Sequence, residues 1–315
     1  MELILNPPFK SFRSRELNLK AVKRRTLIFT TCVLFALCMA SAPAARAQSS
    51  EFGALVGTSF YLGDLNQAGL FKGCHLAGGV MYRYNFSPRW ALKANILFGK
   101  VSASDAGTLN AQRNLSFMSP ISELSVQAEL NFLKLYNAPQ QNRFTPYIFA
   151  GLSLFSFDPQ AQHPNGTWYE LQSLGTEGQG IPDSNGVAAK RYSLTSFAIP
   201  FGIGFKVTIG RHICLGAEWG IRYTFTDYLD DVRGVYYDND VLREQHGSIV
   251  ADLADRTPEL IDPETNAPYP YNKPGTQRGN TTTTDLYSFA GIFFTVKFGN
   301  ESKTCDLHKP RKPRH

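Results

Sequence analysis

The sequence predicts an all-β protein: an eight-stranded antiparallel transmembrane up-and-down barrel with long extracellular loops. Three observations predict this fold. Apolar and polar residues alternate with a period of two along eight segments, each about a dozen residues long. Short and long connections alternate between these segments. A leader that is first basic and then apolar precedes them, as in exported proteins.

The clearest hairpin comprises residues 197–208 and 213–226. Phe197 and Ile199 point to one face of its first segment, whereas Lys206 points to the other. About a dozen residues is the length that a tilted strand needs to cross a bilayer. Strands of soluble proteins are usually about five to six residues long. The hairpin therefore favours a membrane barrel.

The other segments repeat this pattern along the chain. In order, the expected strands are residues 51–61, 75–86, 90–101, 123–132, 144–157, 197–208, 213–226 and 285–298. The fourth is the most regular, because Glu123, Gln127 and Glu129 alternate with Leu124 and Val126. An α-helix would spread these two sets around its circumference, so the alternation predicts a strand.

The connections between the strands differ in length in a regular way. The short ones are residues 87–89, 134–143 and 209–211, and the long ones are residues 62–74, 102–119, 158–195 and 227–284. Short turns on one side and long loops on the other are typical of bacterial outer-membrane barrels. We therefore expect the long loops outside the cell and the turns and termini in the periplasm.

One face of the expected sheet carries ionisable residues, and the opposite face is nearly all apolar. The inward residues are Glu51, Arg83, Lys93, Glu123, Glu129, Lys206, Glu218, Arg222 and Lys297. The alternative, a secreted β-sandwich or a lipocalin-like barrel, would be apolar inside and polar outside. So many ionisable residues on one face, opposite a nearly continuous apolar face, fit the reverse arrangement, with the charges inside and the apolar face outward. Because an eight-stranded barrel has an interior that side chains just fill, we expect an ion-paired core without an open conduit.

Residues 1–47 are predicted to be a cleaved signal peptide. An apolar run at 26–40 follows basic residues, and Ala45-Arg46-Ala47 fits a cleavage site. The run is too short for a spanning helix. This segment contains eight Lys and Arg against two Asp and Glu, so 24 basic and 24 acidic residues remain beyond it. The balanced remainder argues against nucleic acid as a partner.

The predicted organisation continues with the barrel at 48–298 and a basic periplasmic tail at 299–315. The tail could dock on an acidic periplasmic partner or on anionic headgroups, or it could be a solvated end. Cys214, at the start of the seventh strand, could form a disulfide with Cys305 in the tail. Alternatively, Cys305 could cross-link the chain to another protein.

An acidic cluster, Asp227, Asp230 and Asp231, lies just after the seventh strand. Together with His246 and Asp252 or Asp255 further along the chain, such carboxylates could bind calcium or activate water. They could instead pair with Arg222, Arg233 or Arg256 and cap turns. The structural role is favoured. The sequence predicts no catalytic residue, no cofactor and no metal site, and it contains neither a G-x-S-x-G nor an H-E-x-x-H motif.

Several short motifs follow one another in a characteristic order. They are Tyr61-Leu62-Gly63-Asp64-Leu65, Ser116-Phe117, Ile121-Ser122-Glu123, Thr145-Pro146-Tyr147, Gly175-Thr176-Glu177-Gly178-Gln179-Gly180, Ile199-Pro200-Phe201-Gly202, Thr224-Phe225-Thr226-Asp227-Tyr228-Leu229-Asp230-Asp231-Val232 and Gln277-Arg278-Gly279. In these stretches, across roughly residues 51–298, the chain resembles the PorG-like family of outer-membrane barrels, which is associated with type IX secretion and gliding motility.

The resemblance implies a non-enzymatic component of a protein secretion assembly. Its implied partners are the outer-membrane lipid bilayer and periplasmic secretion-ring proteins or a lipoprotein. The basic tail with its cysteine departs from a minimal barrel of this family. The alternative is a surface enzyme or adhesin that uses the loops 158–195 and 227–284 on a small closed barrel.

Overall fold

The computed structural model describes residues 49–66, 73–133, 143–182, 186–210 and 212–298. The predicted signal peptide and the predicted basic tail with Cys305 lie outside the described residues.

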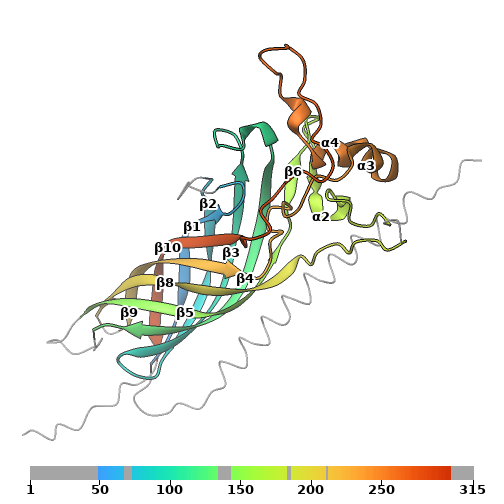
Figure 1. The fold of residues 1–315 in the computed structure, drawn as a ribbon. Coiled ribbons are helices and arrows are strands. Elements are labelled where there is room, and N and C mark those ends of the chain that lie inside the picture. The colour runs from blue at the N-terminus through green and yellow to red at the C-terminus, as the bar shows by residue number, and fades with distance from the viewer. Residues whose placement is uncertain (1–48, 67–72, 134–142, 183–185, 211, 299–315) are drawn as a thin grey trace, which may run out of the picture. The chain divides into compact units, whose positions relative to one another are not determined.

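Eight long strands pair antiparallel, each with its neighbour around a ring (Figure 1). They are β1 (Ser49–Leu62), β2 (His75–Asn85), β3 (Trp90–Ser104), β4 (Ser116–Asn131), β5 (Phe144–Phe157), β8 (Thr195–Ile209), β9 (Ile213–Thr224) and β10 (Leu286–Phe298). The first strand pairs with the last, β1 with β10, and the pairing of β3 with β4 completes the ring. The predicted eight-stranded barrel is confirmed.

The two faces of the barrel wall have opposite chemistry. Large apolar side chains point outward, among them those of Leu76 and Ile292, residues that are 79% and 70% exposed. On the inner face, Glu51 and Arg83 lie opposite each other on β1 and β2, and both are fully buried. So many exposed apolar side chains around one belt fit contact with lipid. The fold is that of a small outer-membrane barrel.

The β3–β4 hairpin is longer than its sequence pattern predicts. Its ladder runs from Trp90↔Leu130 to Ser104↔Ser116. The expectation that residues 102–119 form a loop is therefore wrong at both ends, and only residues 105–115 connect the strands. Small and polar residues dominate the added pairs, so they contribute backbone hydrogen bonds without a clear apolar alternation.

The loops beyond β5 and β9 fold into a structured region, here called the loop layer (residues 158–182, 186–194 and 225–285). It contains β6 (Gln160–Gln162), β7 (Trp168–Glu170), α2 (Leu171–Leu174), α3 (Asn239–His246), α4 (Ser248–Ala254) and the 3-10 turn η2 (Thr257–Glu259). The 3-10 turn η1 (Ala111–Arg113) lies in the β3–β4 connection. Figure 1 shows β6, α2, α3 and α4 gathered in one region. Among the described residues, no helix is long and apolar enough to cross a membrane.

Packing between the two long loops explains why these short helices form. Ile181 packs with Leu242 and Val250 in one small core, and Leu171 packs with Leu253 in another. Isolated helices of eight residues or fewer are marginal in water, so contacts between segments far apart in sequence stabilise them.

Candidate functional site

The barrel interior is organised around the carboxylate of Glu129. Its Oε1 lies 2.8 Å from Arg83 Nε and 3.7 Å from Lys93 Nζ, and its Oε2 lies 2.8 Å from Lys206 Nζ. These four side chains are fully buried. Arg83 also contacts Glu51 at 2.8 Å, and an uncompensated charge at this depth would be costly.

Two contacts join strands that lie on opposite sides of the ring. Lys93 Nζ on β3 is 2.5 Å from Glu218 Oε2 on β9. Tyr287 on β10 donates a hydrogen bond of 2.8 Å to Glu123 on β4. In the ring order, each of these strand pairs is separated by three others on either side. Side chains therefore cross the interior at two places.

The remaining ionisable residues of the inner face join these contacts. Arg222 Nε lies 3.0 Å from Glu123 Oε2, and Lys297 Nζ lies 3.9 Å from Glu51 Oε1. All the inward charged residues that the sequence named are thus brought into one interior. Aromatic rings flank the cations as well, because the Arg222 guanidinium lies 4.7 Å from the centre of the Phe289 ring.

A second cluster lies where the loop layer meets the barrel. Tyr61 Oη donates to Asp230 Oδ2 at 2.6 Å and is also in hydrogen-bond contact with Asp285 Oδ1. A phenol has one proton to donate, so the second contact requires a proton on a carboxyl group. The other oxygen of each carboxyl accepts a hydrogen bond of 2.9 Å from a backbone N–H group. Val232 donates to Asp230 Oδ1, and Leu229 donates to Asp285 Oδ2.

Burial governs the protonation of this pair. It raises the pKa of the Asp230 carboxyl well above its usual range, and the neighbouring Asp285 raises that pKa further. Burial also raises the pKa of Asp285. Two adjacent buried carboxyls cannot both ionise without a large cost in free energy. The pair therefore keeps at least one proton near neutral pH.

Asp231 anchors one segment of the loop layer to another. Its carboxylate accepts hydrogen bonds from Thr176 Oγ1 at 2.5 Å and from Tyr192 Oη at 2.6 Å. Arg278 donates to the backbone oxygen of Asp231 at 2.6 Å and to Glu177 Oε1 at 3.0 Å. Three of the motifs described from the sequence, around 176, 231 and 278, therefore meet at one place.

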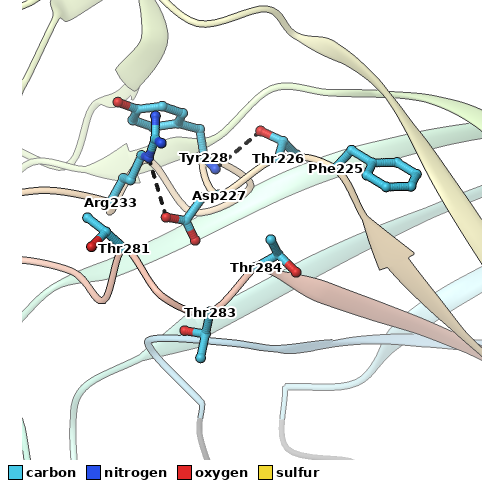
Figure 2. Close-up of a pocket in the computed structure, with 8 residues that line it drawn as sticks. All are labelled: Phe225, Thr226, Asp227, Tyr228, Arg233, Thr281, Thr283 and Thr284. Carbon is cyan, nitrogen blue, oxygen red and sulfur yellow. Dashed lines mark hydrogen bonds and ion pairs between the residues drawn. The ribbon is translucent and has the colours of Figure 1, made fainter.

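Asp227 behaves differently from the other two aspartates of its cluster. It lines a pocket of about 260 Å³ with Phe225, Thr226, Tyr228, Arg233, Thr281, Thr283 and Thr284 (Figure 2). Its Oδ2 lies 3.6 Å from Arg233 Nε. Burial, reinforced by Asp64, raises the pKa of Asp227 to about 7.

Comparison with known families assigns the chain. A family model described as a domain of unknown function, DUF6089, matches residues 28–174 and 181–252. The chain belongs to the DUF6089 family. No curated protein matches its sequence.

Three solved structures illustrate the general likeness of this DUF6089 protein to small barrels. Ail, the attachment invasion locus protein of Yersinia pestis in complex with sucrose octasulfate, is 8% identical over 80% of this chain and 100% of its own, with a TM-score of 0.36. Neisserial surface protein A is 10% identical over 81% of this chain and 100% of its own, with a TM-score of 0.37. OprG from Pseudomonas aeruginosa is 9% identical over 82% of this chain and 99% of its own, with a TM-score of 0.37. At these scores, the fold assignment rests on the strand pairing described above.

The structure separates the residues that the sequence had suggested as a hydrolytic or calcium site. His246 Nδ1 contacts the backbone oxygen of Leu174 at 2.7 Å, and Asp252 pairs with Arg243 at 2.9 Å. Among the described residues, no group of three or more His, Cys, Asp or Glu side chains could hold a metal ion. Of the arginines expected to pair with the cluster, Arg233 does so, whereas Arg222 and Arg256 pair with glutamates.

Cys214 is fully buried on the inner face at the start of β9. Its proposed partner, Cys305, lies outside the described residues.

The sequence pattern did not connect Tyr61 and Asp285 with Asp230. Nor did it connect Glu177 and Arg278 with Asp231. Tyr61 and Asp285 are separated by 224 positions in the chain, and neither lies in a local pattern that points to the other. Tyr61, Glu177 and Arg278 do lie within the short motifs described from the sequence, at 61–65, 175–180 and 277–279. That membership was the sequence signal that could have pointed to them. Gly178 gives one reason for a motif glycine, because its φ is +81° and a Cβ there would lie 2.4 Å from the Tyr237 ring.

Replacing Glu129 with alanine should destabilise the barrel by about 3–5 kcal/mol, because three buried cations lose their shared carboxylate. Unfolding by urea in lipid vesicles, followed by heat-modifiable gel migration, measures this change. The matched control is Glu259→Ala, which breaks a partly exposed pair with Arg256 at 2.8 Å and should cost about 1 kcal/mol or less. Equal losses in the two variants would contradict a central role for Glu129.

The loop layer should become less stable as pH rises from about 4 to above 7. Asp227, Asp230, Asp231 and Asp285 all have folded-state pKa values above their unfolded ones, and that of Asp231 is about 6. The unfolded segment therefore ionises first, and stability present below about pH 4 is lost as pH rises through the folded-state values.

Unfolding of the loop layer can be followed through Trp168 on β7, with Trp90 and Trp219 replaced by phenylalanine. Asp285→Asn should flatten the dependence on pH, whereas Asp240→Asn, at an exposed position of α3, should leave it unchanged. Stability that increases between pH 5 and pH 8 would refute this explanation.

Proposed function

We propose that this chain is a non-enzymatic outer-membrane component of a protein secretion assembly of the type IX kind. In this role it joins the outer membrane to periplasmic ring proteins or to a lipoprotein. The observation that carries the proposal is the interior, where Lys93–Glu218 and Tyr287–Glu123 contacts run between opposite strands. A barrel filled in this way acts through its surfaces and not as a diffusion channel.

The positions of the motif residues support a scaffolding role. Glu177, Asp231 and Arg278 are engaged with one another in contacts that hold the loop layer together. The side chain of Arg278 is almost fully buried. The motifs that resemble the PorG-like family thus describe a structural unit, and the secretion role itself is inferred from that resemblance.

A surface adhesin is the second candidate function. It would use apolar side chains that the loop-layer segments and the β3–β4 connection leave exposed: Leu109, Trp168, Val187, Val235 and Ile261. Exposed apolar side chains of this kind mark contact sites for other macromolecules when they are contiguous.

The purified barrel should show no steady ion conductance in planar lipid bilayers. The reason is that the buried ion pairs occupy the interior between opposite strands. A well-characterised porin, reconstituted in parallel, is the positive control. Stable single-channel steps that persist after repurification would contradict a filled interior.

Deletion of the gene should reduce the secretion of type IX-like cargo, and gentle detergent extraction should recover periplasmic ring proteins or a lipoprotein with the barrel. Complementation with Asp227→Ala should restore secretion, since this residue lies in the loop layer and not in the periplasmic turns. Intact secretion in the deletion strain, together with a surface activity lost in Asp227→Ala, would favour the alternative.

A further inference from the structure

The pocket at Asp227 is built from two segments that flank the junction of the barrel and the loop layer. One follows β9 and supplies Thr226 and Asp227, and the other precedes β10 and supplies three threonines, at 281, 283 and 284. Figure 2 shows the Asp227 carboxylate facing this second segment, with Arg233 beside it and the Phe225 ring turned away. The lining is therefore rich in hydroxyl groups, with one carboxylate and one guanidinium.

Two polar atoms of this lining are buried without a hydrogen-bond partner among the described residues. They are Oδ2 of Asp227 and Oγ1 of Thr284. The ion pair with Arg233, at 3.6 Å, is too long to be a hydrogen bond to that oxygen. Buried polar atoms in folded proteins almost always have a hydrogen-bond partner. A polar group that enters the pocket would supply the missing partner to both atoms.

The charges around the pocket restrict what can enter. Burial is the main cause of the raised pKa of Asp227, and the negative charges of Asp64 and Glu177 raise it further, so an anionic ligand would meet repulsion. A divalent cation would need more carboxylates, and the described residues contain no cluster of three that could hold one. The hydroxyl-rich lining offers little to a purely apolar ligand. A neutral molecule with several hydroxyl groups matches both the donors and the acceptors.

The half-exposed side chain of Arg233 lies against an aromatic stack. Its guanidinium lies 5.4 Å from the centre of the Tyr228 ring. The Tyr228 ring stacks on Tyr192 at 4.4 Å, and Tyr192 is parallel to Phe157 at 6.4 Å. Such a stack limits the freedom of the Arg233 side chain, which lowers the entropy lost when it donates a hydrogen bond to a ligand.

We propose that this pocket binds a single neutral sugar residue through its hydroxyl groups. Asp227 accepts hydrogen bonds from sugar hydroxyls, Arg233 donates one, and Thr284 satisfies its buried hydroxyl. A volume of about 260 Å³ is below the range of about 300–1,000 Å³ for drug-sized ligands, which suits one sugar ring. The pocket lies on the long-loop side of the barrel, where either free sugars or the ends of surface glycans would reach it.

The test measures binding of neutral sugars to the intact barrel in detergent. Isothermal titration with free neutral hexoses forms one arm, and an array of neutral and sulfated oligosaccharides forms the other. Saturable binding of a neutral sugar should weaken about ten- to a hundredfold in both Asp227→Ala and Thr284→Val. Asp240→Ala, at an exposed position of α3, is the matched control and should bind as the unmodified chain does.

Each outcome decides for or against the site. Binding of free hexoses identifies a soluble sugar, and binding of neutral oligosaccharides alone identifies a glycan end; both support the site. Absence of neutral-sugar binding, binding of sulfated sugars alone, or equal binding in Thr284→Val and Asp240→Ala would overturn it. Heat-modifiable migration shows that each variant is folded, and Thr284→Val keeps the test decisive if Asp227→Ala fails to fold.

Discussion

The structure depends on the pairing of charges inside a wall whose outer face is apolar. Lipid contact requires the apolar belt, so the polar half of each strand must face a narrow interior. In that interior a carboxylate such as Glu129 is stable only because Arg83, Lys93 and Lys206 surround it. The ion pairs therefore favour the strand register that brings these charges together.

The loop layer applies the same constraint in a different setting. Arg278 is buried between Glu177 and Asp231, and it ties together segments that are far apart in the sequence. Tyr61 lies between the carboxyls of Asp230 and Asp285. Burial shields these carboxyls from water and so disfavours their ionised forms. Polar contacts thus organise both regions, whereas small apolar cores complete the packing of the short helices.

The barrel could be predicted from the sequence because a period of two needs only neighbouring residues. The strand β5 was expected at residues 144–157 and is found there. The loop layer could not be predicted in the same way. Its helices α3 and α4 form through contacts with the 158–194 segment, and the Tyr61–Asp285 contact joins positions 224 residues apart. Such long-range contacts leave no local period, so the acidic cluster was recognised with Arg233 but without Tyr61, Tyr192 and Arg278.

The contact of Lys93 with Glu218 has a consequence for assembly. The lysine lies on β3 and the glutamate on β9, so until most of the chain has been inserted the lysine can pair only with Glu129 on the neighbouring strand β4. A half-built sheet would carry unpaired charges on its concave side, and these would need hydration until closure. Insertion is therefore expected to be concerted, with the last strand, β10, sealing the seam against β1 and expelling water in the same step.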